Sequence, residues 1–201
     1  MKTIRPRKNW EFNASEITVW DDFFTSECLK ILKYRVLYGN HWDKDFNSYE
    51  AIDYFKDEDY LSELIAKDLR KKIDIPEFQR GWSFRYRNNT PGVKLHCDPS
   101  LLTLNVWISS DKSMKDRSLN GVNIYKIKPP ENWSYMETHL EKAGAYVKAN
   151  NIQPVHIPYK SNRAILFDGA YLHASAGISM KEGLENRRIS YTMLFGSQQR
   201  A

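Results

Sequence analysis

The spacing of apolar positions changes near residue 82 and divides the chain into two groups of predicted elements. Before this point, a short strand at 17–20 precedes two helices, at 26–37 and 58–72, in which apolar residues recur at helical spacing. One further helix is predicted at 132–149. From residue 82 onward, apolar and polar residues mostly alternate, which predicts strands at 82–87, 93–98, 102–109, 122–127, 155–157, 163–168 and 189–195.

Helices followed by a long series of short strands are typical of an α+β chain in which two sheets form the functional part. The 201 residues suit a single domain, 1–201, and no repeat or Gly/Ser-rich linker divides them. We expect helical support at about 15–78 and a β core at about 79–197.

Composition and charge narrow the possible partners. Hydrophobic residues make up 41% and charged residues 27% of the chain, which is typical of a folded globular protein. The net charge is +5, but Lys2, Arg5, Arg7 and Lys8 supply four of these charges within eight residues that contain no acid. The rest of the chain therefore carries only +1, and on this ground we discount nucleic acid as a partner.

The compartment is inferred from what the sequence lacks. No apolar run reaches the ~18 residues of a membrane span, and the basic N-terminus has no apolar stretch typical of a signal peptide. The two cysteines, Cys28 and Cys97, are far apart and fit a reducing compartment. We expect a cytoplasmic protein with no membrane partner.

Three residues have the chemistry of a metal site. His96 and Asp98 lie two positions apart in a predicted strand, so their side chains share one face while Cys97 faces the other way. His173 follows a predicted strand and turn. Two imidazoles and one carboxylate form the facial triad of non-haem Fe(II) oxygenases, which leaves three metal positions open. The alternative is that Asp98 is a turn acid and both histidines are structural.

The last predicted strand has one polar and one apolar face. Arg188, Ser190 and Thr192 share the polar face, and the residues between them are apolar and should pack on the helices. An arginine that faces the interior needs an anion, and a bound dicarboxylate would accept bidentate hydrogen bonds from Arg188. An internal Asp or Glu is the alternative partner. Arg187 has the opposite phase and should lie outside.

These motifs resemble a known enzyme superfamily. His96-x-Asp98, His173 and Arg188-x-Ser190 resemble the 2-oxoglutarate- and Fe(II)-dependent dioxygenases. The run at 17–29 resembles the opening strand, turn and helix of the prolyl-4-hydroxylase-like branch. The stretches at 157–168 and 185–196 are similar to bacterial and phage members that mostly have no assigned substrate.

The resemblance implies a double-stranded β-helix (jelly-roll) core, with N-terminal helices packed on one sheet and one inserted helix. It implies Fe(II) bound by His96, Asp98 and His173, and 2-oxoglutarate whose 5-carboxylate is bound by Arg188 and Ser190. O2 is the other co-substrate, and ascorbate could serve as the reductant.

Three further residues are candidates for the 2-oxoglutarate pocket. Tyr86 stands where related enzymes carry a pocket tyrosine. Asn105 and Trp107 share one strand face with Thr103, and we expect this face to line the pocket. Tyr86 and Trp107 could equally be ordinary core aromatics.

The implied reaction is hydroxylation of a C–H bond in an amino acid, a peptide or a small metabolite, with release of succinate and CO2. The interval of 15 residues between His173 and Arg188 is that of branches other than the prolyl hydroxylases. One alternative is a nucleic-acid demethylase, but Leu194 stands where those enzymes carry a second arginine. Another is a cupin-like metal-binding module without catalysis. The oligomeric state is left open.

Overall fold

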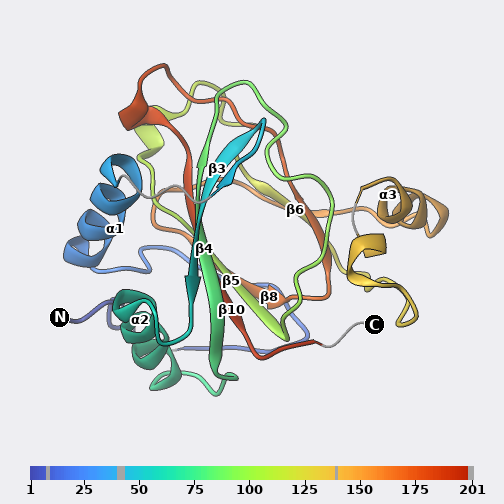
Figure 1. Ribbon diagram of the computed structural model, residues 1–201, viewed down its shortest axis with the longest axis horizontal. Coiled ribbons are helices and arrows are strands. Elements are labelled where there is room, and N and C mark those ends of the chain that lie inside the picture. Colours follow the sequence, from blue (N-terminus) through green and yellow to red (C-terminus); the bar gives the residue numbers. More distant parts are fainter. Residues whose placement is uncertain (8–9, 40–43, 139, 199–201) are drawn as a thin grey trace.

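Two antiparallel sheets form the centre of the computed structural model, which describes residues 1–7, 10–39, 44–138 and 140–198. In the described part they give the two-sheet arrangement of a jelly roll (Figure 1). The larger sheet has the order β1 (Thr18–Trp20), β8 (Ala164–Asp168), β5 (Leu102–Trp107), β10 (Ile189–Phe195), β4 (Phe78–Tyr86), β3 (Tyr49–Phe55) and β2 (Lys44–Asp45). The smaller sheet has the order β7 (Val155–Ile157), β6 (Val122–Tyr125) and β9 (Leu172–Ser175).

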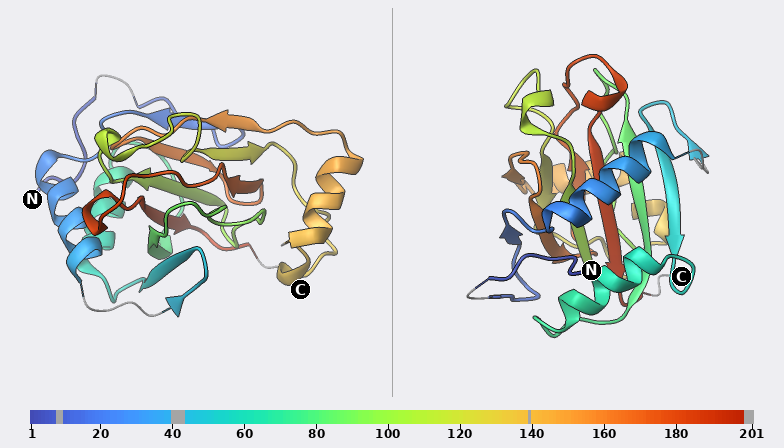
Figure 2. Two further views of the ribbon diagram at one scale, coloured as in Figure 1. Left: turned by 90° about the horizontal axis from the view of Figure 1, so that it is seen from above. Right: turned by 90° about the vertical axis from the view of Figure 1, so that its left-hand side faces the viewer.

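Two helices, α1 (Ser26–Tyr38) and α2 (Tyr60–Arg70), lie on the outer face of the larger sheet (Figure 2). Each begins at a residue that satisfies a free backbone amide: Thr25 accepts from the Cys28 amide, and Asp59 accepts from the Ser62 amide. Among the described residues, no helix has the length and apolarity needed to cross a bilayer.

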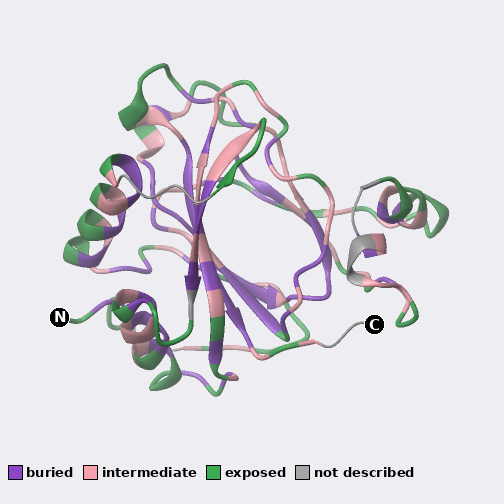
Figure 3. Ribbon diagram, viewed as in Figure 1, coloured by how far each residue is buried: buried purple, intermediate pink, exposed green. Residues whose placement is uncertain are grey.

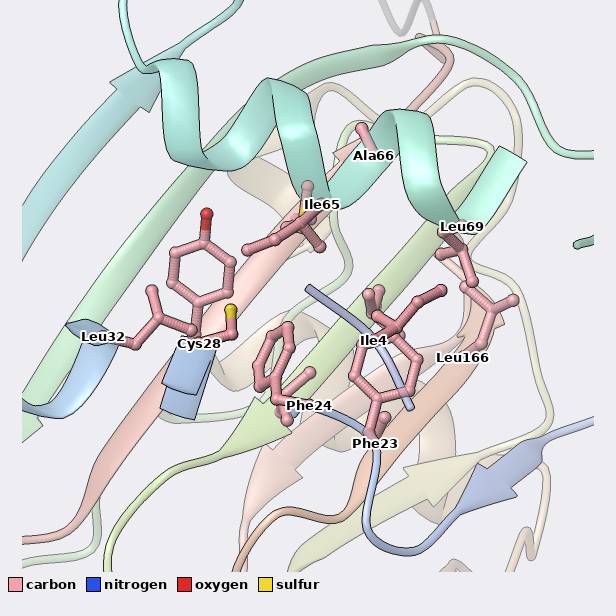
Figure 4. Packing of buried hydrophobic residues seen from close by; sticks show 14 of the residues in the cluster. Ile4, Phe23, Phe24, Cys28, Leu32, Ile65, Ala66, Leu69 and Leu166 are labelled. Carbon is pink, nitrogen blue, oxygen red and sulfur yellow. The ribbon is translucent and has the colours of Figure 1, made fainter. Parts of the chain in front are cut away.

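The main hydrophobic core lies between these helices and the larger sheet. Figure 4 shows Ile65 and Leu69 of α2 directed towards Phe24 and Leu166, and Figure 3 shows burial concentrated in the strands beneath. All seven residues of β10 are buried. The predicted phase of this strand is confirmed, because its apolar face belongs to this core: Ile189, Tyr191, Met193 and Phe195.

The strand predicted at 93–98 does not form, and this prediction is wrong. His96 makes a single antiparallel bridge to His173 of β9. On one side of the bridge, Val93 bonds to Ser175; Val93 is three residues from His96, but Ser175 is only two from His173. On the other side, Asp98 bonds to Gly169; Asp98 is two residues from His96, but Gly169 is four from His173. These unequal intervals prevent a regular ladder from extending from the bridge.

Three strands and one helix boundary were not anticipated. The hairpin β2–β3 lies within the stretch predicted to be helical support, and His173, which follows the turn as predicted, lies within a further strand, β9, that was not predicted. The single helix predicted at 132–149 is instead a 3-10 turn, η2 (Tyr135–Thr138), and a helix, α3 (Leu140–Ala149); residue 139 lies outside the described residues. α3 lies on the opposite side of the molecule from α1 and α2 (Figure 1).

Candidate metal centre

His96, Asp98 and His173 bring three potential metal ligands together, with one ligand atom from each residue within 4.8 Å of the others. Nε2 of His96 lies 3.6 Å from Oδ1 of Asp98, and Nε2 of His173 lies 3.5 Å from Oδ2. Two ligands about 2.1 Å from one metal and at right angles would be about 3 Å apart, so small adjustments suffice to bind an ion. The three residues thus form one facial ligand set.

The backbone fixes both imidazole rings. Nδ1 of His96 lies 2.7 Å from the Lys94 carbonyl oxygen, and Nδ1 of His173 lies 2.9 Å from the Tyr171 carbonyl oxygen. A carbonyl only accepts, so each Nδ1 carries the proton and each Nε2 presents its lone pair towards Asp98. Both lone pairs are therefore available for the metal.

One hydroxyl group holds the carboxylate, and a second hydroxyl group orients the first. Asp98 is only 3% exposed, and Oγ1 of Thr103 on β5 donates to its Oδ2 at 2.7 Å. Oγ of Ser100 lies 3.0 Å from Thr103 Oγ1. Because the Thr103 proton is directed to Asp98, Ser100 is the donor of this second bond. A Cβ at Gly169 would lie 2.3 Å from Ser100 Oγ, so the turn before β9 requires glycine.

Burial keeps His96 in the protonation state that metal binding needs. It lowers the pKa of His96 to about 4, and His173 acts in the same direction because two imidazolium charges would repel. Asp98 partly opposes this effect. His96 is consequently neutral at physiological pH, as a metal-ligating imidazole must be.

A separate hydrophobic cluster supports the back of the ligand set. Two of its buried residues adjoin the candidate ligands: Cys97 lies between His96 and Asp98, and Leu172 precedes His173. Both pack against α3, at Ala143 and Val147. Among the described residues, those of α3 line neither cavity at the site. The inserted helix therefore supports the ligand segments from behind and does not cover the site.

Arg188 lies inside the molecule, as its strand phase predicts. It is 2% exposed, and its guanidinium carbon lies 4.6 Å from the Tyr86 ring centroid and 5.6 Å from that of Trp107. Nε and Nη1 are buried without a hydrogen-bond partner in the described part of the chain. Burial lowers the pKa of Arg188, an effect that Tyr86 and Tyr159 oppose. Such a guanidinium requires an anion.

A small cavity of about 30 Å³ joins Arg188 to the three candidate metal ligands, and Tyr86 and Asn105 also line it. It has room for one water molecule, so a five-carbon diacid requires the lining side chains to move. Asn105 Oδ1 and the Thr192 hydroxyl are further buried polar atoms that lack partners within the described residues. These groups could form further hydrogen bonds with a ligand in the same cavity.

The other predicted pocket residues lie close to Arg188 without lining this cavity. Ser190 Oγ donates to the Tyr86 hydroxyl at 3.3 Å, and Trp107 stacks on Tyr159 with ring centroids 5.1 Å apart. Tyr159 was not predicted, because it lies in a loop where no periodicity marks it. Its ring centroid lies 6.0 Å from the Arg188 guanidinium.

Arg187 lies on the outer face, as expected from its opposite phase. Its Nη1 is 2.9 Å from Glu50 Oε2, which also accepts from Arg85 Nε at 2.7 Å. The two adjacent arginines therefore occupy different environments: one has a carboxylate partner, and the other has a buried guanidinium with free donors.

No protein-family model and no curated protein matches this sequence. The fold does match solved structures. The chain is similar to HygX from Streptomyces hygroscopicus, solved with nickel and 2-oxoglutarate, with a TM-score of 0.60, 13% identity, and coverage of 90% of this chain and 82% of HygX. Another HygX structure also holds hygromycin B.

Two further solved structures share the fold. One is the carbocyclase SnoK from nogalamycin biosynthesis, described as non-heme and alpha-ketoglutarate-dependent, with a TM-score of 0.61, 8% identity, and coverage of 92% and 83%. The other is a Pseudomonas putida prolyl-4-hydroxylase, with a TM-score of 0.54, 8% identity, and coverage of 91% and 93%. The chain therefore has the fold of the 2-oxoglutarate- and Fe(II)-dependent oxygenases.

Proposed function

We propose that this protein is an Fe(II)- and 2-oxoglutarate-dependent dioxygenase that hydroxylates a C–H bond of an amino acid, a peptide or a small metabolite and releases succinate and CO2. Its fold is that of structures solved with metal and 2-oxoglutarate, and one of those also holds a small molecule. The His96, Asp98 and His173 set fits the metal by its chemistry and geometry.

The observation that carries the proposal is the buried Arg188 guanidinium, which shares a cavity with the three ligands. An internal carboxylate could have been its partner. Among the ion pairs of the described residues, however, none includes Arg188, and the acid in the same cavity, Asp98, lies against the two histidines. A metal at one end and an unpaired guanidinium at the other favour a dicarboxylate that reaches between them.

Each group has a defined part in the mechanism. His96, Asp98 and His173 would hold Fe(II), which with 2-oxoglutarate and O2 supplies the oxidising chemistry. Arg188 neutralises the distal carboxylate and, with Ser190, fixes its orientation. Trp107 and Tyr159 flank the guanidinium and exclude water, which strengthens its interaction with the carboxylate.

The adjacent arginines provide a matched test. Arg188→Ala should raise the apparent KM for 2-oxoglutarate by roughly 30-fold or more, since truncating one partner of a buried charged pair costs about 2–5 kcal/mol. Arg187→Ala removes the same charge from the outer face and should change KM little. Succinate release with Fe(II), ascorbate and a metabolite panel measures both. Equal effects of the two variants would contradict the assignment.

The same assay separates the alternatives. A metal-binding module without catalysis would bind metal through His96, Asp98 and His173 but consume no 2-oxoglutarate. A hydroxylase should add one oxygen atom to its product, which mass spectrometry detects. Leu194, buried in β10, supplies no cation for a nucleic-acid strand, so methylated oligonucleotides should not stimulate succinate release.

A further inference from the structure

A larger cavity, of about 500 Å³, opens beside the metal centre. His96 and Asp98 line its inner end, and β2, β3, β4 and the segment 92–99 supply its walls. Its size is typical of sites for small organic ligands. A substrate held in this cavity would lie next to His96 and Asp98, so the chemistry of the walls indicates the substrate class.

One wall is aromatic. Trp82 and Phe84 lie on the inner face of β4, and Tyr49 of β3 lies beside them with its ring centroid 5.0 Å from that of Phe84. Phe46, in the turn between β2 and β3, stacks on Tyr49 at 4.8 Å and is 43% exposed. Trp82 and Phe84 are only partly buried. Open aromatic faces around a cavity favour a flat, largely apolar ring.

The same cavity carries an excess of positive charge. Lys44 Nζ and Arg80 Nη2 lie 2.9 and 2.8 Å from one oxygen of Asp53. Although burial acts in the other direction, hydrogen bonds from these two cations lower the pKa of Asp53, which therefore stays ionised. Lys94 lines the cavity next to His96.

Setting aside the metal ligand Asp98, the described lining residues bring three cations and one carboxylate to this cavity. Arg80 also lies over the Trp82 ring, 5.1 Å from its centroid, so the cationic and aromatic surfaces adjoin. A ligand with an anionic group attached to a planar ring would satisfy both surfaces. A neutral or cationic aromatic ligand would satisfy only the aromatic surface, and an aliphatic acid only the cationic surface.

We propose that this cavity binds the substrate and that the substrate is an aromatic acid, a planar ring bearing a carboxylate or phosphate group. The class of ligand is inferred from the residues of the cavity alone. That this ligand is the substrate rests on the proposed function.

Binding to the metal-free protein tests the ligand class without any turnover. Isothermal titration calorimetry compares indole-3-acetate with the neutral indole-3-acetamide and the cationic tryptamine, and phenylacetate with phenyl phosphate to distinguish the two anions. We expect an acid to bind at least about tenfold more tightly than the amide or amine, because only the acid brings an anion that pairs with the excess of cations. Equal binding of all three indoles, or no binding of any acid, would overturn the proposal.

Variants locate the binding. Lys94→Gln should weaken binding of the acid severalfold and leave the amide unchanged, whereas Lys148→Gln, an exposed lysine on α3, should affect neither. Phe84→Leu should weaken both ligands. An acid preference that persists unchanged in Lys94→Gln, Lys44→Gln and Arg80→Gln would contradict the assignment of the cavity.

The two proposals fail in different assays. If the protein consumes 2-oxoglutarate in an Arg188-dependent manner but no aromatic acid binds, the substrate class is wrong and the proposed function stands. If aromatic acids bind but 2-oxoglutarate is never consumed, the cavity assignment stands and the reaction is wrong. Acids that bind and stimulate succinate release support both, whereas stimulation by peptides alone would overturn the substrate class.

Discussion

Thr103 controls the metal centre without being one of the proposed ligands. Its hydroxyl donates to Asp98 and accepts from Ser100, and all three residues are buried. Thr103→Val keeps the shape but removes both bonds, so the carboxylate is no longer held in place. We expect metal affinity to fall by about tenfold or more, the usual effect of losing a group that orients a ligand. Titration with Mn(II) or Co(II) measures this.

Thr103→Ser is the matched control, because it restores the hydroxyl and should recover most of the affinity. Circular dichroism and thermal unfolding would show that both variants fold. If Thr103→Val binds metal as tightly as the unaltered chain, the hydroxyl does not position Asp98.

At the scale of single residues, the sequence supports some predictions and not others. The candidate ligands and Arg188 could be identified because strand phase and residue chemistry point the same way. Thr103 was placed on the pocket face, but its bond to Asp98 depends on the turn at Ser100. Tyr159 could not be found, because its position beside Arg188 depends on a loop that has no local pattern.

At the scale of elements, the clearest predictions are those in which one face of an element is wholly apolar. β10 satisfies this condition, and the assignment of its residues to the two faces followed from the sequence alone. In β3, Glu50 and Asp53 place charges on opposite faces, where ion pairs stabilise both, so alternation in hydrophobicity does not reveal the strand. The segment 93–98 alternates like a strand, but unequal pairing intervals break its ladder.

Asp21 joins the turn before α1 to the turn before β8. Arg163 donates to both of its carboxylate oxygens, and Lys160 approaches one of them. Chiefly through the bond from Arg163, the pKa of Asp21 falls from 3.8 to about 2. A pKa depressed on folding stabilises the protein above the unfolded value, and this contribution is lost as the pH falls through the folded value.

Asp21→Asn should therefore be less stable than the unaltered chain at pH 6, and the difference should shrink below about pH 4 and vanish only below pH 2. Urea unfolding at a series of pH values measures it. Asp74→Asn is the control, since Asp74 is exposed and has no ion pair among those found in the described residues. A difference that stays constant with pH would show that the ion pairs do not contribute.

At the scale of the whole molecule, the proposed metal ligands come from a loop and from the smaller sheet, and Arg188 adjoins the larger sheet. A metal bound with 2-oxoglutarate therefore bridges the two sheets and should stabilise the folded state by mass action. Mn(II) with 2-oxoglutarate should raise Tm more than either alone, as differential scanning fluorimetry would show. His173→Ala should abolish this synergy. A Tm that the pair leaves unchanged would contradict bridging.

The hydrophobic cluster behind the candidate metal centre couples α3 to metal binding, although α3 does not line the cavities at that site. If α3 detaches, Cys97 and Leu172 lose their packing, and these residues flank the proposed ligands. Metal binding should therefore suppress local opening, so that the α3 amides exchange with deuterium more slowly when Mn(II) is bound while those of α1 are unaffected. Such coupling is reciprocal. A partner that binds and immobilises the outer surface of α3 should therefore tighten metal binding by the same factor by which the metal tightens the binding of that partner.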